Sequence, residues 1–163
     1  MTTLSILSPP LRRLFSLIDF APMPRSVDLA RLLEYWRDKR GARVLPGLEE
    51  FGKTEIGDAS ASMFIYRPNR GHAYTLVVGR QAVSPLLGRS EIGDGLAQAK
   101  NRRAAARLRR LFDCANDVGE PVLGEYRMSR GQKWSSVEIL AAPLADGTSS
   151  EKVIFGGVAI HPM

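Results

Sequence analysis

The order in which the hydrophobic period changes along the chain is the strongest constraint on its fold. Apolar residues repeat with the period of a helix in residues 27–40 and again in residues 96–116. They alternate with the period of a strand in residues 63–79 and in three later runs that end at residue 160. Strands and helices do not alternate regularly, which disfavours a doubly wound parallel sheet. The sequence therefore predicts an α+β domain, in which a five-stranded antiparallel sheet carries helices on one face.

Residues that start or stop regular structure set the expected bounds. Ser26 is a predicted N-cap for the first helix, and Gly41 a predicted stop. The turn Pro68–Gly71 joins residues 63–67 and 72–79 in a predicted hairpin. The mixed stretch that follows has Val83, Leu86 and Leu87 as predicted helical anchors. The last three strands are expected at residues 122–129, 133–140 and 153–160.

Residues 1–24 form a predicted N-terminal extension to a domain of residues 25–163. Prolines flank residues 11–20, in which four apolar residues fall on one face of a predicted helix: Leu11, Leu14, Phe15 and Ile18. This segment is either a helix that packs on its own domain, a frayed tail, or an amphipathic helix that docks on another chain or a membrane surface.

The helix at residues 27–40 has an apolar stripe of its own. The stripe consists of Leu29, Leu32, Leu33 and Trp36. We expect this stripe to be buried on a sheet. The stripes of the two N-terminal helices are also the first candidates for a homodimer interface or for contact with an unknown protein partner.

Composition excludes several kinds of site. One cysteine, Cys114, rules out an internal disulfide and a multi-cysteine metal centre. With only His72 and His161, no metal site is predicted. No uninterrupted run of about 18 apolar residues occurs, so no transmembrane helix is expected. A lone thiol fits a reducing compartment, and we expect a cytoplasmic protein.

All of the formal net charge of +6 lies in residues 100–110. Outside this segment the basic and acidic residues are equal in number, 17 of each. The segment is either a solvated helix face, a patch for an acidic protein partner, or a site for nucleic acid or an anionic membrane surface. Nucleic acid is disfavoured, because no aromatic residues are interleaved with the cations. The basic patch comprises Lys100, Arg102, Arg103, Arg107, Arg109 and Arg110.

Short runs in five parts of the chain share one resemblance. They are Leu33–Trp36 with Arg40, Gly41, Leu45 and Pro46; Tyr74–Gly79; Leu87–Arg89 with Ile92 and Gly93; Leu111–Asp113 with Gly119–Val122; and Glu138–Leu140 with Pro143, Leu144 and Ile154–Gly157. Over residues 26–161 the chain resembles a family of small bacterial proteins that consist of a single PAS domain. The order of two strands, a helical stretch and three strands is the PAS order. Residues 47–58 depart from the family, which usually has a more polar approach that contains Asp-Pro.

The resemblance implies a regulatory module in signal transduction. PAS domains commonly hold a small ligand between the sheet and the helices, or dimerise through an N-terminal helix and the outer sheet face. A ligand would meet the inward face of the sheet, and the alternative is that the same side chains simply fill the core. The candidate pocket residues are Phe64, Tyr66, Tyr74, Leu76, Tyr126, Trp134 and Val137.

No sequence pattern for catalysis is present, and the chain is predicted not to be an enzyme. The glycines of Gly88–Gly95 lack the spacing of phosphate-binding loops. Cys114 follows Asp113, whose charge would raise the pKa of a thiol, so we expect a packing residue. Haem is disfavoured because no histidine lies between residues 80 and 120, and flavin because no reactive-cysteine motif is seen. No cofactor is predicted.

Overall fold

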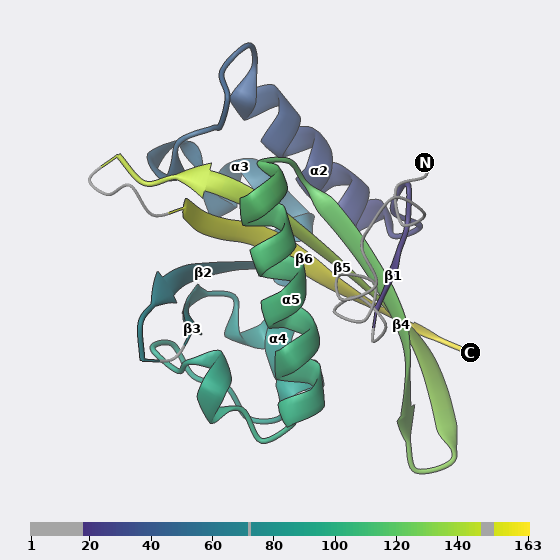
Figure 1. Ribbon diagram of the computed structural model, residues 1–163. Coiled ribbons are helices and arrows are strands. Elements are labelled where there is room, and N and C mark those ends of the chain that lie inside the picture. Colours follow the sequence, from purple (N-terminus) through teal and green to yellow (C-terminus); the bar gives the residue numbers. More distant parts are fainter. Residues whose placement is uncertain (1–17, 72, 148–151) are drawn as a thin grey trace.

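The computed structural model describes residues 18–71, 73–147 and 152–163. One open antiparallel sheet runs through the molecule, with helices packed against it (Figure 1). The strands are β1 (Asp19–Phe20), β2 (Met63–Asn69), β3 (Ala73–Val78), β4 (Val122–Arg130), β5 (Lys133–Ala145) and β6 (Lys152–Pro162). The α-helices are α2 (Val27–Arg40), α3 (Lys53–Ile56), α4 (Arg80–Leu87) and α5 (Arg102–Val118). Short 3-10 turns lie at η2 (Leu48–Glu50), η3 (Gly57–Ser62) and η4 (Leu96–Gln98).

The sheet contains six strands, in the spatial order β1-β4-β5-β6-β2-β3. The five predicted strands are confirmed, and the hairpin of β2 and β3 is joined to the last three strands by the pairing of β2 with β6. The sixth strand, β1, pairs Asp19 with Glu125 and Phe20 with Gly124. The prediction of a helix over residues 11–20 is therefore wrong at its end, because these two residues make strand pairs.

Helices cover both faces of the sheet, which corrects the expectation of helices on one face. Helices α4 and α5 pack on one side and α2 on the other, and each side has its own core cluster. Adjacent residues of β6 show the division. An added Cβ at Gly156 would meet the ring of Phe64 in the α5-side core, while one at Gly157 would meet Leu29 and Leu32 of α2.

The two long helices begin at capping side chains. The predicted cap of α2 is confirmed, since the Ser26 hydroxyl accepts a hydrogen bond from the Leu29 N–H at 3.2 Å. Helix α5 begins at Arg102 and not at Leu96, because the Asn101 side chain accepts from the Ala104 N–H and caps the helix there. Among the described residues, no helix is long and apolar enough to cross a membrane.

At Gly156 a neighbouring strand and an aromatic ring lie too close to leave room for a side chain. A Cβ built there would lie 2.7 Å from the tip of the Phe64 ring and closer still to the Leu140 carbonyl oxygen. The carbonyl belongs to β5, which pairs with every residue of β6 from Lys152 to Pro162. Neither neighbour can move without shifting a strand, so the centre of the sheet requires a residue without a side chain.

Gly156→Ala should lower the free energy of unfolding by about 1–3 kcal/mol, the usual cost of forcing an extra carbon into a packed core. Gly147→Ala is the matched control, because a Cβ there meets nothing within 4 Å. Urea unfolding followed by circular dichroism measures both. Equal stability of the two variants would contradict the close approach.

Candidate functional site

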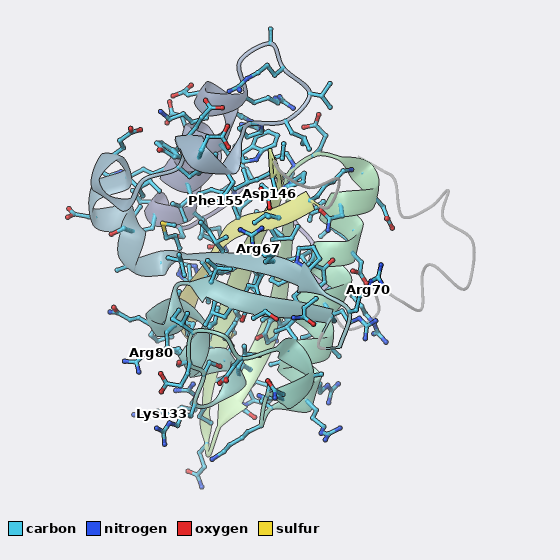
Figure 2. The ribbon with its side chains drawn as sticks, turned by 90° about the vertical axis from the view of Figure 1, so that its left-hand side faces the viewer. Arg67, Arg70, Arg80, Lys133, Asp146 and Phe155 are labelled. Carbon is cyan, nitrogen blue, oxygen red and sulfur yellow. The ribbon has the colours of Figure 1, made fainter. Side chains whose placement is uncertain are left out.

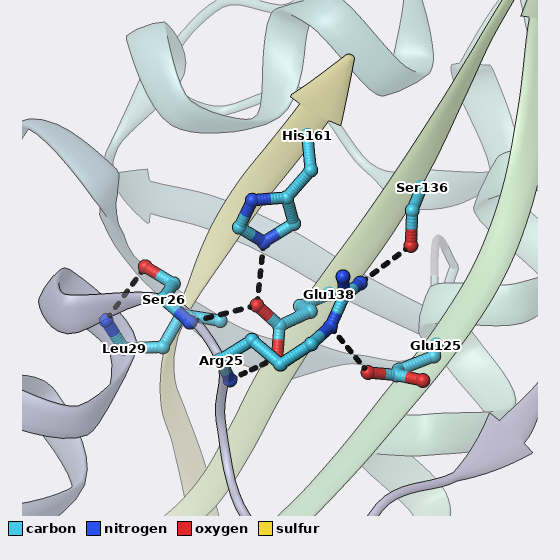
Figure 3. Close-up of polar contacts among 7 residues, drawn as sticks. All are labelled: Arg25, Ser26, Leu29, Glu125, Ser136, Glu138 and His161. Atoms are coloured by element: carbon cyan, nitrogen blue, oxygen red, sulfur yellow. Dashed lines mark hydrogen bonds and ion pairs between the residues drawn. The ribbon is translucent and has the colours of Figure 1, made fainter. Parts of the chain in front are cut away.

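A buried carboxylate joins the sheet to the start of α2. Glu138 lies in the middle of β5 and is fully buried. Its two oxygens accept hydrogen bonds from the backbone N–H groups of Arg25, at 2.7 Å, and Ser26, at 2.9 Å. The His161 ring, on β6, lies 2.6 Å from the same carboxylate (Figure 3). The first residues before α2 are thereby fixed on the sheet.

The same contacts keep Glu138 ionised. Burial by itself raises the pKa of this carboxyl, since it penalises the charged form. The two backbone N–H groups and the imidazole outweigh that penalty, and the pKa of Glu138 lies below its ordinary value. An anion at the N-terminus of a helix is further favoured by the helix dipole.

Arg25 extends this cluster toward the edge of the sheet. Its guanidinium donates to the Ser136 hydroxyl at 2.6 Å and lies 3.3 Å from the Glu125 carboxylate (Figure 3). Ser136 is on β5, and Glu125 is on β4. One residue therefore ties the approach to α2 to the sheet through both its backbone and its side chain.

Beyond this cluster, no described element covers the α2 side of the sheet. Side chains alternate along a strand, so residues two apart from Glu138 on β5 lie on its face. Ser136 and Trp134 therefore continue that face, and the indole of Trp134 is 53% exposed. Arg127, Trp134, Ser136, His161 and Met163 form what we call the open face.

The open face is hollowed and cationic toward the β4–β5 hairpin. Figure 1 shows this hairpin extending past the rest of the sheet. A hollow of about 980 Å³ lies there, with Trp134 and Met163 in its wall and no acidic side chain in its lining. Its cations are Arg127, Arg130 and Lys133. Because Arg127 and Lys133 form no ion pair with any described residue, their charges are available to a partner.

The structure brings most of the predicted pocket residues together in one buried cluster, in which the aromatic rings contact one another. Phe112 of α5 stands 5.4 Å from Phe64, 5.1 Å from Tyr66 and 5.1 Å from Tyr74, measured between ring centroids. Leu76, Tyr126 and Val137 are buried in the same α5-side cluster. The rings fill the space between one another, which favours a core role; whether a ligand enters stays a prediction.

Trp134 does not belong with that group. It lies on the α2 side of β5, whereas Val137 and Tyr126 face α5. The indole therefore cannot line a pocket with the tyrosines, because the sheet stands between them. The sequence prediction placed Trp134 and Val137 on the same face of the sheet. They are three residues apart on β5, and side chains at an odd spacing along a strand lie on opposite faces.

The predicted partner helices are largely used inside the chain. Leu29, Leu32 and Trp36 are completely buried against the sheet, and the Trp36 indole donates to the Pro143 carbonyl at 2.9 Å. Leu33 is partly buried in the same cluster. Ile18 is buried on the α5 side. These residues cannot bind a second copy without leaving the core; Leu11, Leu14 and Phe15 lie outside the described residues.

The predicted basic patch is divided between two sides of α5. Arg102 and Arg109 border a hollow with Ala73 and Leu96, and Arg109 lies 4.0 Å from Asp113. Arg103 and Arg107 border another hollow beside β4. Lys100 precedes the helix, and Arg110 lies one turn beyond Arg107. The six cations therefore do not present one common face.

The remaining candidates have plain structural roles. Burial raises the pKa of the Cys114 thiol, and Asp117 raises it further, so this cysteine is not activated. Tyr74 donates its hydroxyl to Asp113 at 2.6 Å. His72 lies outside the described residues. Within the described ranges, no group of three or more His, Cys, Asp or Glu side chains is arranged to hold a metal ion.

Sequence reasoning missed Glu138 and Arg25. The signal for Glu138 was one acidic residue inside the apolar run Val137–Leu144. A carboxylate in a buried strand needs donors, and that need could have been stated from the sequence. The donors themselves, two backbone N–H groups from about residue 25, have no signature in side-chain composition.

No protein-family model and no curated protein matches this chain in sequence. The fold and the open face must therefore be interpreted from their own geometry.

Glu138→Gln should lower the free energy of unfolding at pH 7 by about 1–3 kcal/mol, because a neutral amide satisfies the two N–H groups less well. The stabilisation from a carboxylate with a depressed pKa is complete above the ordinary glutamate pKa and disappears as the pH falls through the folded-state value. The gap between the variant and the parent chain should therefore close in acid, below about pH 4.

Urea unfolding at a series of pH values measures this gap. Glu34→Gln serves as control, since Glu34 is an exposed residue of the same helix, α2. Parallel stability curves for Glu138→Gln and the parent chain across the acid range would show that the carboxylate charge contributes nothing.

Proposed function

We propose that this chain is a non-enzymatic regulatory module of the PAS-like kind, which acts by binding another protein through its open face. One observation carries the proposal: a large indole, a methionine and the guanidinium of Arg127 lie together on a sheet face that no described element covers. Trp134 is 53% exposed and Met163 is 67% exposed, although both are residue types that usually become buried. Tryptophan, methionine and arginine are enriched where proteins meet.

The topology supports the PAS-like part of the proposal. The two early strands and the three late strands form one antiparallel sheet, and the helical stretch between them, α4 to α5, packs on a single face. The added strand β1 and the helix α2 on the opposite face lie at the periphery of this arrangement. Such a module would regulate a partner by binding to it, because its open face offers a contact surface for another protein.

Two parts of the sequence prediction receive less support. The ligand-sensing role rests on a pocket whose aromatic residues contact one another. The alternative of a basic helix that binds nucleic acid or an anionic membrane needs one charged face, and the cations of α5 divide between two hollows. Association through the open face needs neither a cavity nor a continuous basic helix.

A photo-crosslinking amino acid placed at position 134 should give one discrete protein adduct in cells that express the chain naturally. The same amino acid at position 92 is the matched control, because Ile92 is similarly exposed, at 58%, but lies away from the open face. Adding Arg127→Glu should remove the adduct at position 134, since it reverses the charge of the unpaired arginine on the same face. The same adducts at both positions, or none at 134, would contradict association through this face.

A further inference from the structure

Beyond Glu125, no described strand covers the edge of β4 that lies next to the open face. Strand β1 pairs with β4 only at Gly124 and Glu125, while β4 continues to Arg130. The Ala21 N–H donates to the Leu123 carbonyl at 3.0 Å, so Leu123 directs its backbone groups to this edge. In an antiparallel ladder alternate residues do the same, which assigns the backbone N–H and C=O of Arg127 and Ser129 to the edge. Among the described residues, no strand pairs with β4 beyond Glu125.

Arginines flank this edge on both faces of the sheet. On the α5 side, Arg103 and Arg107 share a hollow of about 220 Å³ with Tyr126 of β4. On the α2 side, Arg127 belongs to both that hollow and the larger one beneath Trp134. Asp19 and Glu125 border the inner end, where Glu125 already pairs with Arg25. Toward the hairpin tip, the only charged side chains of described residues that line the larger hollow are cations, Arg127, Arg130 and Lys133.

We propose that the edge of β4 at Tyr126–Arg130 binds an acidic, extended segment of a partner protein as an added strand. The proposal rests on the proposed function and deepens it, because it names the chemistry of the partner. Strand addition satisfies the peptide groups of Arg127 and Ser129, with which no described strand pairs. Side chains of an added strand alternate between the two faces, and acidic ones meet Arg103 and Arg107 on one face or Arg127 on the other.

The charge of the edge favours an acidic segment of another protein over two alternatives, a second copy of this chain and residues 1–17 of the same chain. A second copy paired at the same edge would place Arg127 and its neighbours against an identical set of cations, and like charges across an interface oppose association. Residues 1–17 contain Arg12, Arg13 and no acidic residue, so their charge does not complement that of the edge. Cations on a sheet edge commonly deter self-pairing, and here they also define the complementary partner.

Nucleic acid fits this edge less well. Trp134 and the nearby cations resemble a stacking platform, but a nucleic acid would leave the peptide groups of Arg127 and Ser129 unused. It would also need several aromatic side chains in a row, whereas Trp134 is the one aromatic residue that borders the hairpin hollow. The observations therefore favour a peptide.

The test measures binding of a fluorescein-labelled peptide of alternating glutamate and valine residues to the full chain, by fluorescence anisotropy at low salt. We expect saturable binding, and no binding of the lysine–valine peptide of equal length. The glutamate–valine peptide with methylated backbone nitrogens keeps its charge but cannot form the ladder, so its affinity should fall by about tenfold or more. Absence of binding, or equal binding of the methylated peptide, would overturn strand addition.

Two variants locate the binding on the protein. Ser129→Pro removes an edge N–H, and proline is tolerated on an edge strand. Arg127→Glu reverses the charge beside it, and each variant should raise the Kd by about tenfold. Arg70→Glu makes the same change of net charge at the β2–β3 turn, far from Lys133 of the hairpin (Figure 2), and should leave the Kd unchanged. Equal weakening by Arg127→Glu and Arg70→Glu would reduce the site to general charge attraction and overturn the proposal.

Two further results separate the alternatives. A thymidine oligonucleotide that binds more tightly than the acidic peptide, with the same loss in Arg127→Glu, would replace the proposal with nucleic-acid binding. If the peptide fails while the crosslink at position 134 persists, the edge proposal is wrong and association through the open face stands. If the peptide does not bind and the crosslink is also absent, both are wrong.

Discussion

The buried carboxylate of Glu138 determines where α2 begins and therefore which part of the sheet stays uncovered. Its oxygens accept the N–H groups of Arg25 and Ser26, while the Ser26 side chain caps the helix. From that point α2 runs away from the hairpin, over Gly157 and toward Pro143. The helix consequently shields one end of its face of the sheet and leaves Trp134 and Met163 exposed. The position of the open face thus follows from the contact between Glu138 and the start of α2. Glu138 and its partner His161 lie at the border of that face.

The two adjacent glycines of β6 allow the sheet to carry a core on each side. At Gly156 the missing side chain leaves room for Phe64, and through it for the ring cluster around Phe112. At Gly157 the same absence admits Leu29 and Leu32 of α2. Apolar burial on both faces keeps β6 buried from Val153 to Val158, and the strand becomes partly exposed from Ala159 onward. The open face therefore forms at the end of β6, where the burial of this strand stops, and on the adjoining parts of β4 and β5.

The sequence predicted the elements well because each has local signals. Helix α2 was expected from its cap and its stripe, and the strands were expected from alternation and turns. The faces were harder, since deciding which side of a strand is inward depends on partners far away in the chain. This is why Tyr126 was placed correctly and Trp134 was not. The helix expected before Asp19 ended in a strand, because pairing with β4 is a long-range contact that local periodicity does not report. Glu138 was overlooked for the same reason: its donors are backbone groups more than a hundred residues away in sequence.

The distribution of charge shows what folding adds to composition. Along the chain, the excess of cations belongs entirely to residues 100–110. In the folded protein, Arg103 and Arg107 border the same hollow as Arg127, beside the edge of β4. Arg102 and Arg109 border a different hollow, with Ala73 and Leu96. The acidic residues that balance the rest of the chain are used in pairs, such as Glu120 with Arg40 and Glu50 with Arg43. Arg127 forms no ion pair with any described residue and lies beside peptide groups of β4 that no described strand pairs with. The proposed acidic, extended segment would satisfy both the charge and the peptide groups.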